Sequence, residues 1–195
     1  AGDAWKNDAA RDLAPHASDI NQYITPSTCL TTPTNQGDLL YCVRAGQINV
    51  EDLMETVAVD QLSEFFIYCK ELNGIVANER SLQADVMKYI IVANDLKGVQ
   101  LVGGETRFRE ALGASSKQAN EIYPALNGPT LLLNLPVLLS VLVKLFTPLF
   151  PKEVAARIKF ERGPLKDIDD LMDIGHGGNA REKFMSEVDN LCYSD

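Results

Sequence analysis

The stretch LLLNLPVLLSVLVKLF, residues 131–146, decides how the rest of this sequence is interpreted. It lies in a run, 122–143, that contains no charged residue. A helix that spans a membrane needs about 20 mainly apolar residues, so the run is long enough by count. Asn134 and Pro136 interrupt it, because proline removes a helical hydrogen bond and favours an extended conformation in the residue before it. We therefore expect a short buried strand that ends at Asn134 and a separate helix after Pro136, instead of one membrane span.

The predicted helix, residues 137–146, is apolar on almost every side. Such a helix is normally buried, and this one is too short to cross a bilayer. Its outer face therefore needs a protein core, a lipid ligand or a membrane surface against it.

Outward from this stretch, apolar runs alternate with segments of helical periodicity. We expect strands at 38–46, 86–98, 130–134 and 156–163, and helices at 50–72, 105–122, 137–146, 152–156, 167–174 and 180–192. Strands that alternate with helices predict an α/β domain with a mainly parallel sheet. We assign that domain to residues 38–195 and expect a polar N-terminal arm at 1–37, irregular from residue 25 onward.

Composition and charge exclude several classes of function. The formal net charge of −9 argues against nucleic-acid binding, which needs a basic surface. The four cysteines form no CxxC pair and there are only two histidines, so no metal site is expected. Scattered cysteines of this kind are typical of reduced core residues in an intracellular protein. The first thirteen residues contain no signal peptide and no initiator Met, so we expect a processed chain or a piece of a larger one.

Two glycine-rich motifs carry no catalytic chemistry. GHGGN, 175–179, is similar to an esterase oxyanion loop, but the sequence lacks the GxSxG nucleophile motif and offers only GASSK, 113–117. LVGGET, 101–106, does not match a phosphate-binding loop. We therefore expect no catalytic residues and no enzyme activity.

A cluster of basic residues accompanies the apolar helix. Between positions 144 and 166 the sequence holds six Lys or Arg residues and two Glu residues, a local charge of +4. Apolar residues beside Lys and Arg favour contact with anionic membrane surfaces. The predicted membrane contacts are Lys144, Lys152, Lys159 and Arg162, and the alternative is an ordinary solvated rim.

Five motifs occur in a characteristic order: NDLKG (94–98), YP (123–124), LLLNLP (131–136), RIKF (157–160) and IGHGG (174–178). Together they resemble the CRAL-TRIO lipid-binding family, whose members carry phosphatidylinositol, tocopherols and retinal. The resemblance covers roughly residues 38–180. It implies a mixed, mainly parallel sheet that floors an apolar pocket, closed by a mobile gate helix at 137–146 and the segment to 156.

The resemblance also implies which residues line the pocket. The expected apolar lining is Phe65, Phe66, Tyr89, Ile91, Leu131, Leu133, Leu138, Leu142 and Phe146, with Ile90 and Leu132 as alternates if the strand faces are reversed. The expected polar anchors are Tyr123, Ser140 and Arg157. For each apolar residue the alternative is a place in the ordinary core.

Two departures from the family pattern concern the ligand. Ala125 stands where phosphoinositide-binding members have a Glu, although Arg157 matches their basic residue. Ile90 and Val92 stand where phosphatidylcholine-binding members have hydroxyl residues. Both departures favour a more apolar ligand, such as a sterol, a carotenoid, a tocopherol- or retinoid-like molecule, or a fatty acyl lipid.

The sequence agrees with two functions. The first is a non-enzymatic carrier that moves a hydrophobic ligand between membranes, with no cofactor other than a bound lipid or isoprenoid-like molecule. The second is a scaffold subunit of a larger complex, whose apolar gate packs permanently on a protein partner. In either case we expect an intracellular protein of the cytoplasm or an organelle, peripheral to membranes.

Overall fold

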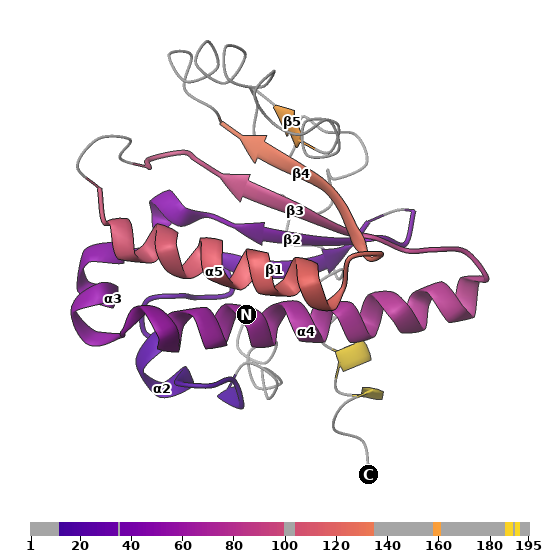
Figure 1. Cartoon of the computed structure of the whole chain (residues 1–195), viewed down its shortest axis with the longest axis horizontal. Helices are drawn as coiled ribbons and strands as arrows, with labels where there is room; N and C mark the ends of the chain where they lie inside the picture. Colours follow the sequence, from indigo (N-terminus) through magenta and orange to yellow (C-terminus); the bar gives the residue numbers. More distant parts are fainter. Residues whose placement is uncertain are drawn as a thin grey trace, which may run out of the picture.

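A five-stranded sheet with the order β1-β2-β3-β4-β5 forms the centre of the computed structural model (Figure 1). The structure describes residues 12–34, 36–99, 104–134, 158–160, 186–188 and 190–191. The strands are β1 (Cys29–Pro33), β2 (Leu39–Val43), β3 (Ile90–Asp95), β4 (Asn127–Leu133) and β5 (Ile158–Phe160). β1 pairs with β2 in the antiparallel sense, and every other pair is parallel. The predicted α/β class with a mixed, mainly parallel sheet is confirmed.

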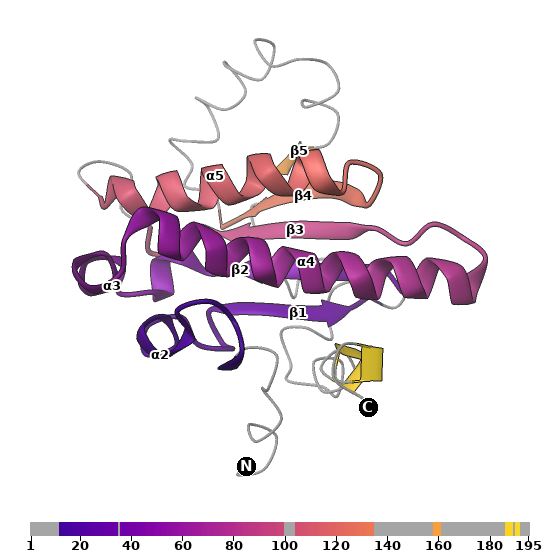
Figure 2. The ribbon, with the colours of Figure 1, turned by 60° about the horizontal axis from the view of Figure 1, so that its bottom comes forward.

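The described helices all belong to one side of this sheet. They are α2 (Ala17–Ile20), α3 (Val50–Thr56), α4 (Val59–Ala84) and α5 (Thr106–Ile122), with a 3-10 turn η1 (Ala45–Gln47) after β2. α4 connects β2 to β3 and α5 connects β3 to β4, so each parallel pair is joined by a helical crossover. Figures 1 and 2 show α4 and α5 running side by side across the same face.

The first long helix is split, contrary to the single helix expected from residue 50. Asn49 caps α3, since its side chain accepts a hydrogen bond from the Asp52 backbone N–H at 3.3 Å. Val57 and Ala58 then take extended conformations, and the Gln61 side chain accepts a hydrogen bond from the Ala58 backbone N–H at 2.9 Å to begin α4. Sequence periodicity does not detect this break, because Val57 keeps the apolar spacing and is itself buried.

β1 lies in a segment that was expected to be irregular, and that expectation was wrong. Its CLTTP sequence is polar, but β-branched threonines favour a strand and Pro33 is tolerated at the edge of a sheet. The Thr31 hydroxyl donates a hydrogen bond to the buried Asn73 Oδ1 of α4 at 2.8 Å. Pairing with β2 and this contact bury polar side chains that look solvent-exposed in the sequence.

The sheet is apolar on both faces. The helix-covered face holds the main core, which includes Phe65, Phe66 and Phe108, whose rings meet edge to face. The opposite face carries a second buried cluster, made of Leu30, Leu40, Cys42, Ala93, Leu131 and Leu133, against which Ile91 packs. No described helix contributes to this second cluster.

The leucine-rich stretch at 131–146 begins as expected. β4 ends at Leu133, and Asn134 follows with a left-handed φ of 53° while its Nδ2 donates a hydrogen bond to Asp95 Oδ1 at 2.7 Å. The predicted helices at 137–146, 152–156 and 167–174 lie outside the described residues. No helix within the described ranges is long and apolar enough to cross a membrane.

The C-terminal segment reaches back to α4. Its described residues 186–188 and 190–191 are helical, within the helix expected at 180–192. Val188 is fully buried in the main core, and the Glu187 carboxylate forms an ion pair with Arg80 of α4.

Candidate functional site

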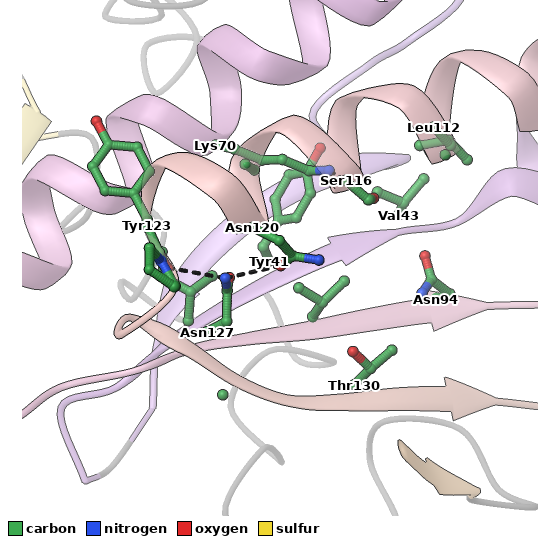
Figure 3. A pocket seen from close by; sticks show the side chains of 16 residues that line it. Tyr41, Val43, Lys70, Asn94, Leu112, Ser116, Asn120, Tyr123, Asn127 and Thr130 are labelled. Carbon is green, nitrogen blue, oxygen red and sulfur yellow. Dashed lines mark hydrogen bonds between the residues drawn. The ribbon is translucent and has the colours of Figure 1, made fainter. Parts of the chain in front are cut away.

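A cavity of about 640 Å³ lies between α5, the middle of α4 and the sheet (Figure 3). The strands contribute Tyr41, Val43, Ile90, Val92, Asn94, Asn127, Gly128 and Thr130; the helices and the turn after α5 contribute Lys70, Leu112, Gly113, Ser116, Ala119, Asn120, Tyr123 and Pro124. Most strand residues alternate along β2, β3 and β4, because successive side chains of a strand point to opposite faces.

The register of β2, β3 and β4 places the strand residues that form the floor of the cavity in rows across the sheet. Tyr41 pairs with Val92, and Val92 pairs with Thr130, so one row crosses three strands beneath α5. Val43 pairs with Asn94 one step further along the strands. The floor is therefore apolar with a polar atom at intervals, which is the usual composition of a small-molecule site.

The end of the cavity at the start of β4 is closed by a hydrogen-bonded asparagine. Asn127 Nδ2 donates to Asn120 Oδ1 at 2.8 Å and to the Tyr123 carbonyl at 2.9 Å. These two bonds fix the turn between α5 and β4, and Figure 3 shows them beside the cavity. Tyr123 reaches towards α4, since a Cβ built on Gly74 would lie 3.1 Å from its ring.

A lysine is present on the helical wall of the cavity. Lys70 Nζ donates hydrogen bonds to Ser116 Oγ at 2.8 Å and to Ser115 Oγ at 3.1 Å, both on α5. Burial lowers the pKa of Lys70 from 10.5 to about 8, although the nearby thiols of Cys29 and Cys69 act in the opposite direction. Among the described residues no carboxylate forms an ion pair with this ammonium group.

Two half-buried thiols, Cys29 and Cys69, and the buried phenol of Tyr41 lie near Lys70. Cys29 Sγ donates a hydrogen bond to the Tyr41 hydroxyl at 3.4 Å, and burial raises the pKa of Tyr41 well above 10.0. Burial also raises the pKa of Cys42, on the other face of the sheet, to about 12. Cys29, Cys42 and Cys69 are reduced, as expected from the sequence, and Cys192 lies outside the described residues. The described part of the chain contains no cluster of His, Cys, Asp and Glu able to hold a metal ion.

The structure distributes the predicted site residues over several places. Tyr123 and the alternate Ile90 line the cavity. Phe65 and Phe66 lie in the helix–sheet core and do not line the cavity. Leu131, Leu133 and Ile91 belong to the cluster on the opposite face of the sheet.

The remaining predicted residues either lie elsewhere in the structure or fall outside the described residues. Tyr89 precedes β3 and is exposed, while the alternate Leu132 is half-buried and is not among the lining residues. Lys159 lies in β5, where it pairs with Leu131. Leu138, Ser140, Leu142, Phe146, Arg157, Lys144, Lys152 and Arg162 lie outside the described residues.

Sequence reasoning missed Lys70, although a signal for it exists. Leu62, Phe66, Asn73 and Ala77 are buried, and Lys70 falls between them at helical spacing. A cation within an otherwise buried stripe is unusual, because a buried charge needs a partner. The serines that accept its hydrogen bonds could not be foreseen, since they come from a different helix.

The described fold is a mainly parallel α/β sheet with a partly apolar cavity beneath α5. The profile of the CRAL/TRIO domain matches residues 26–173, well over half of the chain, so this chain belongs to the CRAL/TRIO family. That family consists of lipid-binding domains, and the resemblance noted in the sequence is confirmed. The matched range begins before β1.

Comparison with solved structures supports the same fold. The crystal structure of Sfh5 superposes with a TM-score of 0.58 over 98% of this chain and 67% of that one, at 16% sequence identity. Identity at this level establishes the fold alone. A comparison with curated protein sequences finds no match.

Proposed function

We propose that this protein binds one hydrophobic, lipid-like molecule in the cavity between α5 and the sheet and transfers it between membranes without catalysis. The observation that carries the proposal is a cavity of about 640 Å³ in a CRAL/TRIO domain. Pockets that enclose small molecules have volumes of about 300–1,000 Å³, so this cavity is large enough for a substantial part of a lipid.

The cavity offers a lipid both an apolar and a polar environment. Val43, Ile90, Val92 and Leu112 supply apolar surface for a chain or ring system. Each methylene removed from water contributes about 0.8 kcal/mol, so burial of a few carbons already favours the bound state strongly. Carriage in solution then follows from burial, and no chemical step is required.

Membrane contact is assigned to the segment that the family resemblance identifies as the gate. That segment, 137–156, and the basic residues Lys144, Lys152 and Arg162 lie outside the described residues, so their role stays a prediction. Electrostatic attraction to anionic lipids would bring the gate to the bilayer, where exposure of its apolar face is no longer unfavourable.

The test begins with native mass spectrometry of the purified chain, followed by organic extraction and identification of any bound lipid. Transfer is then measured from fluorescent donor liposomes to acceptor liposomes. Val92→Trp should fill the floor of the cavity and abolish both ligand retention and transfer, because Val92 lies in the central row of the floor. Gln118→Trp on the exposed side of α5 is the matched control and should behave as the parent chain. An empty chain that takes up no lipid from liposomes would refute the proposal.

One observation favours the scaffold function as a second candidate. Five large apolar side chains are exposed where α4 and α5 end and β3 begins: Leu82, Val86, Met87, Tyr89 and Ile122. Exposed apolar side chains close together often mark a protein interface. Size-exclusion chromatography separates the two functions, since a carrier should elute as a ligand-loaded monomer whereas a subunit should self-associate without its partner.

A further inference from the structure

The cavity between α5 and the sheet has a positively charged side chain on its wall. Lys70 lies on the stripe of α4 that faces the sheet and α5, and its side chain is half-buried. The chain as a whole carries a formal net charge of −9, so a half-buried cation on a cavity wall stands out against its surroundings. A partly desolvated cation is unfavourable without a counter-charge, and an anionic ligand would supply one.

Within the described part of the chain, the hydrogen bonds of Lys70 leave its charge without a carboxylate partner. An ammonium group has three donors, and two of them reach the neutral hydroxyls of Ser115 and Ser116. Ser115 Oγ in turn donates to the Leu112 carbonyl at 3.0 Å, which holds that hydroxyl in place. The pKa of Lys70, lowered by burial to about 8, still leaves the group mostly protonated at neutral pH.

We propose that the ligand of this cavity carries an anionic oxygen group, a carboxylate or a phosphate, and that Lys70 and Ser116 bind that group. The inference rests on the proposed function, because it assigns the polar end of the molecule that the cavity holds. Figure 3 shows the Lys70 side chain directed at Ser116 on the cavity wall. The Ser116 hydroxyl can rotate to donate to an anion while Lys70 supplies the charge-assisted hydrogen bond.

The rest of the lining agrees with one polar end and one apolar end. Val92 and Ile90 of the floor are apolar, so an acyl chain or ring system can lie along β3. Asn120 is already engaged with Asn127, which makes it less available to a headgroup than Lys70. The proposed ligand class is therefore an anionic amphiphile, such as a fatty acid or an alkyl phosphate. Of the ligands expected from the sequence (a sterol, a carotenoid, a tocopherol- or retinoid-like molecule, or a fatty acyl lipid), this choice favours the last.

Matched probes test this inference. We would titrate the full chain at pH 7 with a fluorescent 16-carbon fatty acid and with its methyl ester, which differ only in charge. The parent chain should bind the acid at least about 10-fold more tightly, and Lys70→Met should weaken acid binding about 10- to 100-fold while leaving the ester unchanged. Lys117→Met is the control, because Lys117 lies on the exposed face of α5 away from the cavity.

The pH dependence supplies a readout that a purely structural role of Lys70 would not change. Preference for the acid should fall as the pH rises from 7 to 9.5, because the ammonium group loses its proton near pH 8 in the free protein. The Lys70→Met variant should show no such fall. Equal binding of acid and ester by the parent chain, or failure to bind either probe, would overturn the inference. The proposed function is refuted separately, if the chain is also empty and takes up no lipid from liposomes.

Competition distinguishes the two sources of an anionic group. Hexadecyl phosphate should displace the fluorescent acid at micromolar concentration if the site recognises the headgroup of an amphiphile. Displacement by inorganic phosphate alone at similar concentration would overturn the amphiphile assignment and identify a site for a free anion. Lys70→Met should weaken whichever competitor occupies the site, and an unchanged response would contradict the role of Lys70.

Discussion

The Lys70→Met variant should be more stable than the parent chain at neutral pH, even though it removes two hydrogen bonds. The pKa of Lys70 is about 8 in the folded protein and 10.5 as its ordinary value, because burial disfavours the charged form. A group whose pKa is lowered on folding destabilises the fold fully below its folded pKa, and the effect disappears as the pH rises towards the unfolded pKa. The difference of pKa corresponds to a destabilisation of about 3 kcal/mol at pH 7.

The net effect is smaller than this figure. Methionine has a similar length and no charge, so it removes the destabilisation but loses the bonds to Ser115 and Ser116, each worth about 1 kcal/mol. The variant should therefore be about 1–2 kcal/mol more stable at pH 7. By pH 10 the parent chain recovers about 2.5 kcal/mol of the destabilisation, so the order of stability should reverse.

The assay is urea denaturation of both chains, without ligand, at pH 7 and at pH 10. Tyr41 and Cys42 have ordinary pKa values of 10.0 and 9.0 that are raised on folding, so they also make stability depend on pH, but they are common to both chains and cancel in the difference. Lys117→Met should show almost no difference at either pH, because Lys117 is exposed. A Lys70→Met variant that is less stable at pH 7, or whose stability difference does not change with pH, would refute the reasoning.

Three further substitutions test the packing around the site, each by urea or thermal denaturation. Gly113→Ala should stabilise the fold by about 1 kcal/mol, because a Cβ there meets nothing within 4 Å and alanine favours the helix; a loss of stability would contradict this. Gly46→Ala should destabilise by more than about 2 kcal/mol, because the new Cβ would lie 2.1 Å from the Lys97 carbonyl oxygen, so near-neutral behaviour would show that the loop moves freely. Thr31→Val should destabilise the fold by about 1–3 kcal/mol, because Asn73 Oδ1 would lose its hydrogen bond while Asn73 Nδ2 already lacks a partner within the described structure. An unchanged denaturation midpoint would show that this buried amide finds another hydrogen bond.

The strands β2, β3 and β4 could be predicted because each is a short apolar run bounded by turn residues. Which side chains of these strands point to which face of the sheet could not be predicted, because runs such as Ile90 to Val92 contain no alternation of apolar and polar residues. β1 was missed for the opposite reason, because its threonines are buried by pairing with β2 and by Asn73, which are long-range effects. Lys70 illustrates the same limit, because its helical position is visible in the sequence but its serine partners on α5 are not.

The asparagines at the two ends of β4 help to fix the register of this strand in the sheet. A shift of β4 by one residue would replace Leu131 and Leu133 in the buried cluster by Leu132 and either Thr130 or Asn134, so one buried leucine would be lost. Asn127, bonded to Asn120 and the Tyr123 carbonyl, and Asn134, bonded to Asp95, make contacts that only one register satisfies. The two amide side chains therefore add to leucine burial in fixing the register in which Thr130 faces the cavity while Leu131 and Leu133 face away from it.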